Sequence, residues 1–129
     1  MMKKWIILTA FGLVGSIACK EAVDEKWERA RTEVELKVTY GKVQFGLHEF
    51  HQAFNRFPST EEGLEILVNN PGNLSQWQGP YVDKKYLKDP WRRKLQYRLV
   101  NGKPKIYSKG RSGTENIDLD TILDRGEDN

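Results

Sequence analysis

The sequence of 129 residues predicts an α+β fold in which a long N-terminal helix packs on a small antiparallel sheet. Two observations carry this prediction. Apolar residues recur at helical spacing over residues 36–54, and two strand-like segments joined by Asn-Gly follow within residues 94–110. A short second helix is expected between them. The length suits one domain, which we place at residues 34–123.

Residues 1–18 have the composition of an export signal. Lys3 and Lys4 precede an uncharged apolar stretch from Trp5 to Ala18, which is the order of the basic and apolar regions of a signal peptide. The stretch is shorter than the ~20 residues that a helix needs to cross the hydrocarbon core. A cleaved signal peptide is therefore favoured, and a permanent transmembrane anchor is the alternative.

Cys19 is the only cysteine and directly follows this segment. An intramolecular disulfide is impossible, so a lone thiol in an exported protein needs another role. Gly15–Cys19 resembles the bacterial lipobox, although Ser16 stands where a leucine is usual; we expect lipidation of Cys19 by diacylglycerol, with an ordinary signal peptide as the alternative. Lys20, in place of an aspartate linked to inner-membrane retention, favours a periplasm-facing anchor on the outer membrane over the inner.

The charge of the remaining chain argues against a nucleic-acid binder. Without residues 1–18 the formal net charge falls from +3 to +1, which leaves no large positive field. Residues 19–33 comprise Cys19 and a charged tether or the start of a helix.

The long helix has one clear apolar face, made of residues at steps of three and four: Leu36, Tyr40, Val43, Leu47, Phe50 and Phe54. Three further residues are expected to widen this face: Val34, Val38 and Phe45. Gly41 and Gly46 each lower helix stability by roughly 1 kcal/mol relative to alanine, so packing must hold the helix. Because Pro58 disfavours helical geometry at the residue before it, the helix should end near residues 55–56.

The short second helix is predicted by a capping box. Ser59 can cap the first amides, and Glu62 stands three residues later. Gly63 is expected to permit a close approach of helices. The buried face comprises Leu64, Leu67 and Val68, and residues 69–72 end the helix.

Residues 72–94 predict a packed loop held by aromatic side chains: Trp77, Tyr81, Tyr86 and Trp91. A hairpin follows, with strands at 94–100 and 105–110 joined through residues 101–104, because Asn-Gly is a strong hairpin-turn signal. An acidic loop comes next. The tail at 124–129 is expected to be disordered.

Six short motifs occur in order along the chain: Phe57-Pro58-Ser59-Thr60, Glu62-Gly63-Leu64, Gly79-Pro80-Tyr81, Asp89-Pro90-Trp91, Leu95-Gln96-Tyr97 and Tyr107-Ser108-Lys109-Gly110. Between Gly41 and Ile122 the sequence thereby resembles the globular part of the G-type major pseudopilin of the bacterial type II secretion system. The resemblance implies a pilin-like fold. It marks eight positions as structural: Pro58, Gly63, Leu64, Asp89, Pro90, Trp91, Tyr97 and Gly110.

The resemblance also implies a calcium site in the acidic loop, since calcium prefers six to eight oxygen ligands. Asp118 and Asp120 match the closing Asp-x-Asp, and carbonyls near Lys109 and Ser112 are expected to help. The loop is shorter than the family pattern, and Ser112 stands at its first acidic position. A solvated acidic loop is the alternative.

The sequence departs from the family pattern at two further places. Pseudopilins begin with a Phe-Thr-Leu-Ile-Glu start to an apolar helix, which this sequence lacks, so polymerisation as a standard subunit is not expected. Arg92 replaces the glycine that often follows Asp-Pro-Trp, which affects the turn rather than the fold.

The sequence offers no catalytic constellation. His48 and His51 lie three apart on the long helix, without a third ligand at a metal-binding spacing. Four aspartates lack an accompanying nucleophile or phosphate loop: Asp89, Asp118, Asp120 and Asp124. We expect a non-enzymatic pseudopilin-like envelope lipoprotein, a component or accessory of type II secretion whose partners are other secretion proteins. The alternative is a free-standing envelope lipoprotein that uses the fold as a binding module.

Overall fold

The structure, a computed structural model, describes the backbone of residues 2–124 and the side chains of residues 17–124. The chain divides into two compact units, one ending at Glu33 and the other beginning at Val34. Each is described by itself. The predicted disordered tail falls outside the described residues, apart from Asp124.

The first unit consists of helix α1, which runs from Met2 to Phe54 and continues into the second unit. The described charged side chains of this unit, from Lys20 to Glu33, are exposed. Arg29 and Glu25 form an ion pair one helical turn apart at 3.8 Å. The charged residues after Cys19 are therefore helical.

Among the described residues, we find no helix that combines the length and the apolar character needed to cross a membrane.

In the second unit, α1 buries the apolar face that the periodicity predicts. Five of its residues are almost fully buried: Leu36, Tyr40, Val43, Leu47 and Phe50. The helix ends at Phe54, close to the predicted position, and Asn55 follows in a left-handed conformation with φ of 53°. Its amide donates to the His51 carbonyl at 2.7 Å, which closes the last turn.

The prediction that three more residues widen this face is wrong. Val34, Val38 and Phe45 are exposed, at 60%, 49% and 62%. At about 100° per residue they cluster on the side of α1 opposite the buried face. We call these three residues the outer face of α1.

The segment after Pro58 contains the predicted capping box, and the predicted short second helix follows it. Ser59 Oγ accepts from the Glu62 amide at 3.1 Å, and Glu62 Oε1 accepts from the Ser59 amide at 2.8 Å. The chain then forms only a 3-10 helix, η1, at Leu64–Leu67. Gly63 has φ of 65°, and a Cβ added there would meet nothing within 4 Å. Gly63 therefore serves a left-handed turn, and the predicted close helix approach is wrong.

The close approach to α1 occurs at Gly46. A Cβ there would lie 3.1 Å from the Tyr81 carbonyl oxygen and from the Val82 Cβ, so the loop passes directly over this glycine. Tyr81 also meets Phe50 edge-on, with ring centroids 6.0 Å apart. The aromatic loop continues into a second 3-10 helix, η2, at Lys84–Leu87.

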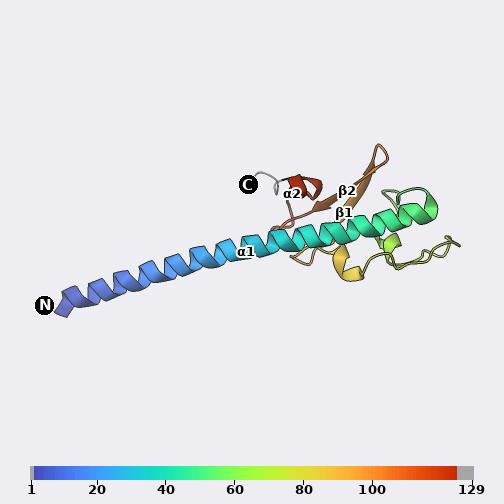
Figure 1. Ribbon diagram of the computed structural model, residues 1–129. Coiled ribbons are helices and arrows are strands. Elements are labelled where there is room, and N and C mark those ends of the chain that lie inside the picture. Colours follow the sequence, from blue (N-terminus) through green and yellow to red (C-terminus); the bar gives the residue numbers. More distant parts are fainter. Residues whose placement is uncertain (1, 125–129) are drawn as a thin grey trace. The chain divides into compact units, whose positions relative to one another are not determined.

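The sheet lies against the C-terminal part of α1 (Figure 1). Strand β1, Gln96–Val100, pairs antiparallel with β2, Lys103–Ser108, in the register Tyr97 to Ile106. The turn is tighter than predicted, because only Asn101 and Gly102 lie outside the strands, both with positive φ.

Two elements follow where the sequence predicted only an acidic loop. Strand β3, Ile117–Asp118, pairs antiparallel with the end of β2, and helix α2 spans Asp120–Asp124. Within the described residues the sheet has three strands in the order β1-β2-β3. A long helix on a small antiparallel sheet confirms the predicted fold class.

Candidate functional site

The Asp-Pro-Trp motif forms a buried polar anchor. Asp89 is only 4% exposed, and its Oδ1 accepts from the amides of Trp91 at 3.0 Å and Arg93 at 2.9 Å. Its Oδ2 accepts from Ser108 Oγ at 2.8 Å, and that hydroxyl in turn accepts from the Gly110 amide at 3.1 Å. These residues thus fasten the 89–93 turn to the end of β2, which is a structural task.

A second motif contact joins Pro58 to the sheet. The Tyr97 hydroxyl donates to the Pro58 carbonyl at 2.8 Å in a buried position. Burial, with a smaller contribution from the Glu62 charge, raises the pKa of Tyr97 to about 12. The hydroxyl therefore remains a donor at physiological pH. Leu64, the remaining motif residue here, is buried in the core.

The capping box carries an ion pair. Arg56 donates to both carboxylate oxygens of Glu62, at 2.6 and 3.0 Å. The hydrogen bonds from Arg56, followed by those from Ser59, lower the pKa of Glu62 to about 2 against the opposing effect of burial.

The acidic loop brings Asp118 and Asp120 together around a lysine. Lys105 Nζ lies 2.6 Å from Asp120 Oδ2 and 3.8 Å from Asp118 Oδ2. Burial raises the pKa of Asp120, but hydrogen bonds from Lys105 and Tyr40 outweigh it, so that the pKa is lowered overall. Sequence reasoning missed Lys105 because only the pairing of β2 with β3 brings it to the loop.

Ser112 and Lys109, the other two residues predicted to help bind calcium, form hydrogen-bond contacts with nearby residues of the loop. Ser112 Oγ and Thr114 Oγ1 are 2.9 Å apart, and the Lys109 carbonyl accepts from the Glu115 amide at 3.0 Å. Within the described residues no group of three His, Cys, Asp or Glu side chains is arranged to hold a metal ion. The calcium site stays a prediction.

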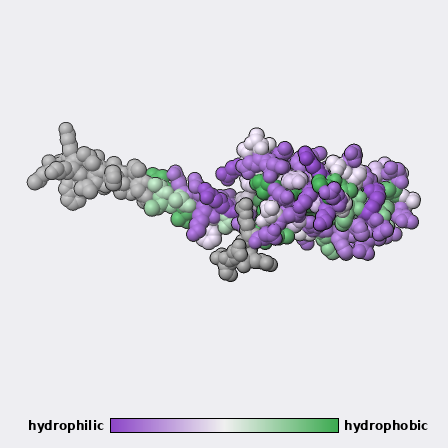
Figure 2. All heavy atoms as spheres, turned by 90° about the horizontal axis from the view of Figure 1, so that it is seen from above, coloured by the Kyte–Doolittle hydropathy of each residue, from purple (hydrophilic) through white to green (hydrophobic). Residues whose placement is uncertain are grey.

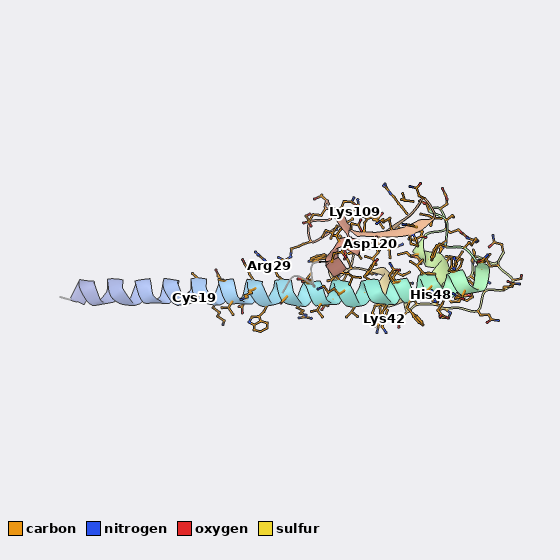
Figure 3. All side chains as sticks on the ribbon, turned by 45° about the horizontal axis from the view of Figure 1, so that its top comes forward. Cys19, Arg29, Lys42, His48, Lys109 and Asp120 are labelled. Atoms are coloured by element: carbon orange, nitrogen blue, oxygen red, sulfur yellow. The ribbon has the colours of Figure 1, made fainter. Side chains whose placement is uncertain are left out.

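The remaining candidates lie on α1. Cys19 is exposed on the first unit. His48 is exposed on α1 (Figure 3). His51 is half-buried, with its ring centroid 4.6 Å from that of Phe57. The structure thus gives His51 a packing contact.

The outer face of α1, which the sequence analysis assigned to the core, is an apolar part of the surface of the second unit. Hydrophilic side chains cover most of the face seen in Figure 2, with scattered hydrophobic ones. The outer face of α1 gathers Val34, Val38 and Phe45 on one side of one helix. A signal was present, because their helical positions differ by about 180° from the Leu36–Phe50 face.

Comparison with known proteins places these observations in a family. The family described as "Type II secretion system (T2SS), protein G" matches residues 23–122. The type II secretion system core protein G of Xanthomonas campestris pv. campestris is 32% identical over 87 residues, which cover 67% of this chain and 54% of that protein. The chain thus spans about half the length of that relative.

A solved structure shares the fold. The major pseudopilin from the type 2 secretion system of enterohaemorrhagic Escherichia coli matches with a TM-score of 0.61 and 19% sequence identity. The match covers 73% of this chain and 90% of the other.

Proposed function

Since this chain belongs to the type II secretion system protein G family, we propose that it acts as a non-enzymatic, pseudopilin-like component or accessory of type II protein secretion. The observation that carries this proposal is the match over residues 23–122, which includes every residue of the core from Leu36 to Ile122. The buried polar residues of the motifs support it, since Asp89 and Tyr97 are both engaged in hydrogen bonds that hold the fold together.

The proposal includes a lipid anchor at Cys19. The Gly15–Cys19 motif supports it, as does the exposure of the Cys19 side chain. Mass spectrometry of the mature N-terminus is expected to find a lipidated peptide that begins at Cys19. Recovery of an intact, unlipidated segment from Trp5 through Cys19 would contradict the anchor and favour a membrane-spanning helix.

The outer face of α1 is the surface that we propose for contact with secretion subunits. Val34, Val38 and Phe45 are large, apolar and at least 49% exposed, and a cluster of this kind on one face is typical of an interaction site. Its position opposite the buried face leaves the core of the domain undisturbed when a partner binds.

The test is co-purification from detergent extracts of the native host, with secretion subunits identified by mass spectrometry. We expect secretion subunits to accompany the native chain and to be lost with Phe45→Glu. Val100→Glu is a matched control, because Val100 is also exposed, at 43%, but lies on the hairpin. Recovery of the native chain without any secretion subunit would instead support a free-standing binding module.

A further inference from the structure

The side chain of Lys105 connects three elements of the second unit at the acidic loop. It projects from β2 toward Asp118, the last residue of β3, and Asp120, the first residue of α2. Its ammonium is 2.6 Å from Asp120 and 3.8 Å from Asp118. The single ammonium of Lys105 therefore forms ion pairs with two carboxylates.

Every oxygen of these two carboxylates already has a partner. Asp120 Oδ2 faces Lys105, and Asp120 Oδ1 accepts from the Tyr40 hydroxyl of α1. Asp118 Oδ1 accepts from the Asp120 amide at 3.0 Å, and Asp118 Oδ2 faces Lys105. A calcium ion seeking six to eight oxygens would have to displace these donors.

The loop before β3 is closed by its own hydrogen bonds and by another cation. Arg93 donates to the Arg111 carbonyl at 3.2 Å, and its guanidinium lies against Gly113, where an added Cβ would meet Arg93 Cζ at 2.6 Å. The Lys109 carbonyl accepts from the Glu115 amide. The residues of the loop thus do not fit the oxygen cage that the resemblance implies.

We propose that Lys105 is the built-in cation of this loop and that its ammonium takes the place of a calcium ion. Lys105 joins β2 to β3 and to the start of α2. Tyr40 joins the Asp120 carboxylate to α1. The loop is consequently ordered without metal. This inference does not depend on the role in secretion.

The electrostatics of the site agree with this assignment. The hydrogen bond to Asp120, followed by the attraction of the same carboxylate, raises the pKa of Lys105, so the ammonium remains charged at physiological pH. Burial and the bond to Asp120 raise the pKa of Tyr40, which keeps the hydroxyl as a donor. Both partners of Asp120 therefore favour its ionised form.

The experiment measures the thermal unfolding midpoint of the full chain in mild detergent, with calcium chloride or with a chelator. We expect the native chain to have the same midpoint in both conditions. Lys105→Met should lower the midpoint by about 5 °C in chelator. Lys105→Arg should keep the midpoint close to that of the native chain. Lys103→Met, at the exposed start of the same strand, should leave the midpoint unchanged. A calcium-dependent rise of the native midpoint, or an unchanged midpoint for Lys105→Met, would overturn the proposal.

A double-mutant cycle separates the ion pair from a general loss of packing. We compare Lys105→Met, Asp120→Asn and the double variant by urea unfolding. If the ammonium and the carboxylate act together, the double variant should lose little more than the worse single variant. Additive losses would overturn the proposal.

Discussion

Arg92 occupies a backbone conformation that suits glycine. Its φ is 64°, and its amide donates to the Asp89 carbonyl at 2.9 Å, which closes the turn behind the buried aspartate. A side chain in this left-handed region costs roughly 1–2 kcal/mol. The turn tolerates Arg92 because Asp89 is held on both carboxylate oxygens.

We predict that Arg92→Gly is more stable than Arg92→Ala by about 1 kcal/mol. Glycine relieves the strain, whereas alanine keeps it, and the greater freedom of glycine in the unfolded chain offsets only part of the gain. Urea unfolding of both variants at neutral pH measures the difference. Equal free energies of unfolding would mean that the turn stores no strain at Arg92.

At the scale of elements, the turn between α1 and η1 depends on ionised Glu62. Its pKa is lowered to about 2 in the folded chain, against an unfolded value of 4.5. Because the folded pKa is the lower one, the stabilisation is present above about pH 4.5 and is lost as the pH falls toward 2.

Glu62→Ala is therefore expected to lower the free energy of unfolding by about 1 kcal/mol at pH 7. The difference from the native chain should shrink as the pH falls toward 2, when the native carboxylate is protonated as well. Urea unfolding at a series of pH values measures it, with Glu61→Ala as the control for an exposed neighbour. A difference that does not change with pH would contradict the role of the charge.

Gly41 and Gly46 of α1 differ in their surroundings, and this difference makes a prediction for the helix. Gly41 has open space where a Cβ would stand, whereas at Gly46 the Cβ would press on the Tyr81 carbonyl and the Val82 side chain. Gly41→Ala should stabilise the chain by about 1 kcal/mol through helix propensity alone.

Gly46→Ala should gain clearly less than Gly41→Ala, or destabilise, because the crowded loop must move. Thermal and urea unfolding of the pair test this directly. An equal increase in stability for both variants would show that the loop over Gly46 can move without cost.

At the scale of the whole molecule, the core determines which part of the chain folds by itself. Among the side chains that the structure describes, every residue of the hydrophobic core cluster lies between Leu36 and Ile122. A fragment of residues 34–129 is therefore expected to unfold within about 4 °C of a chain that begins at residue 20, a shift that corresponds to roughly 1 kcal/mol. Circular dichroism on heating measures both midpoints. A loss of more than about 8 °C would show that residues before Val34 hold the domain together.

The sequence predicted the elements that depend on local signals. The Leu36–Phe50 periodicity predicted the buried face of α1, and Asn101-Gly102 predicted the hairpin turn. Reasoning from the residues alone was wrong about Phe45, which it assigned to this face although, at about 100° per residue, its position lies about 180° away. It also missed β3, a strand of two residues that is too short to show a period.

By itself, the sequence determined the α+β order of a long helix followed by a small sheet, because helix periodicity, capping and turn chemistry act between near neighbours. Only the tertiary structure decided which glycine is crowded and which cation faces Asp118 and Asp120. These depend on contacts between residues far apart in the chain, such as Lys105 and Asp120 or Gly46 and Tyr81. No local pattern encodes such a contact, because it exists only once the elements have packed.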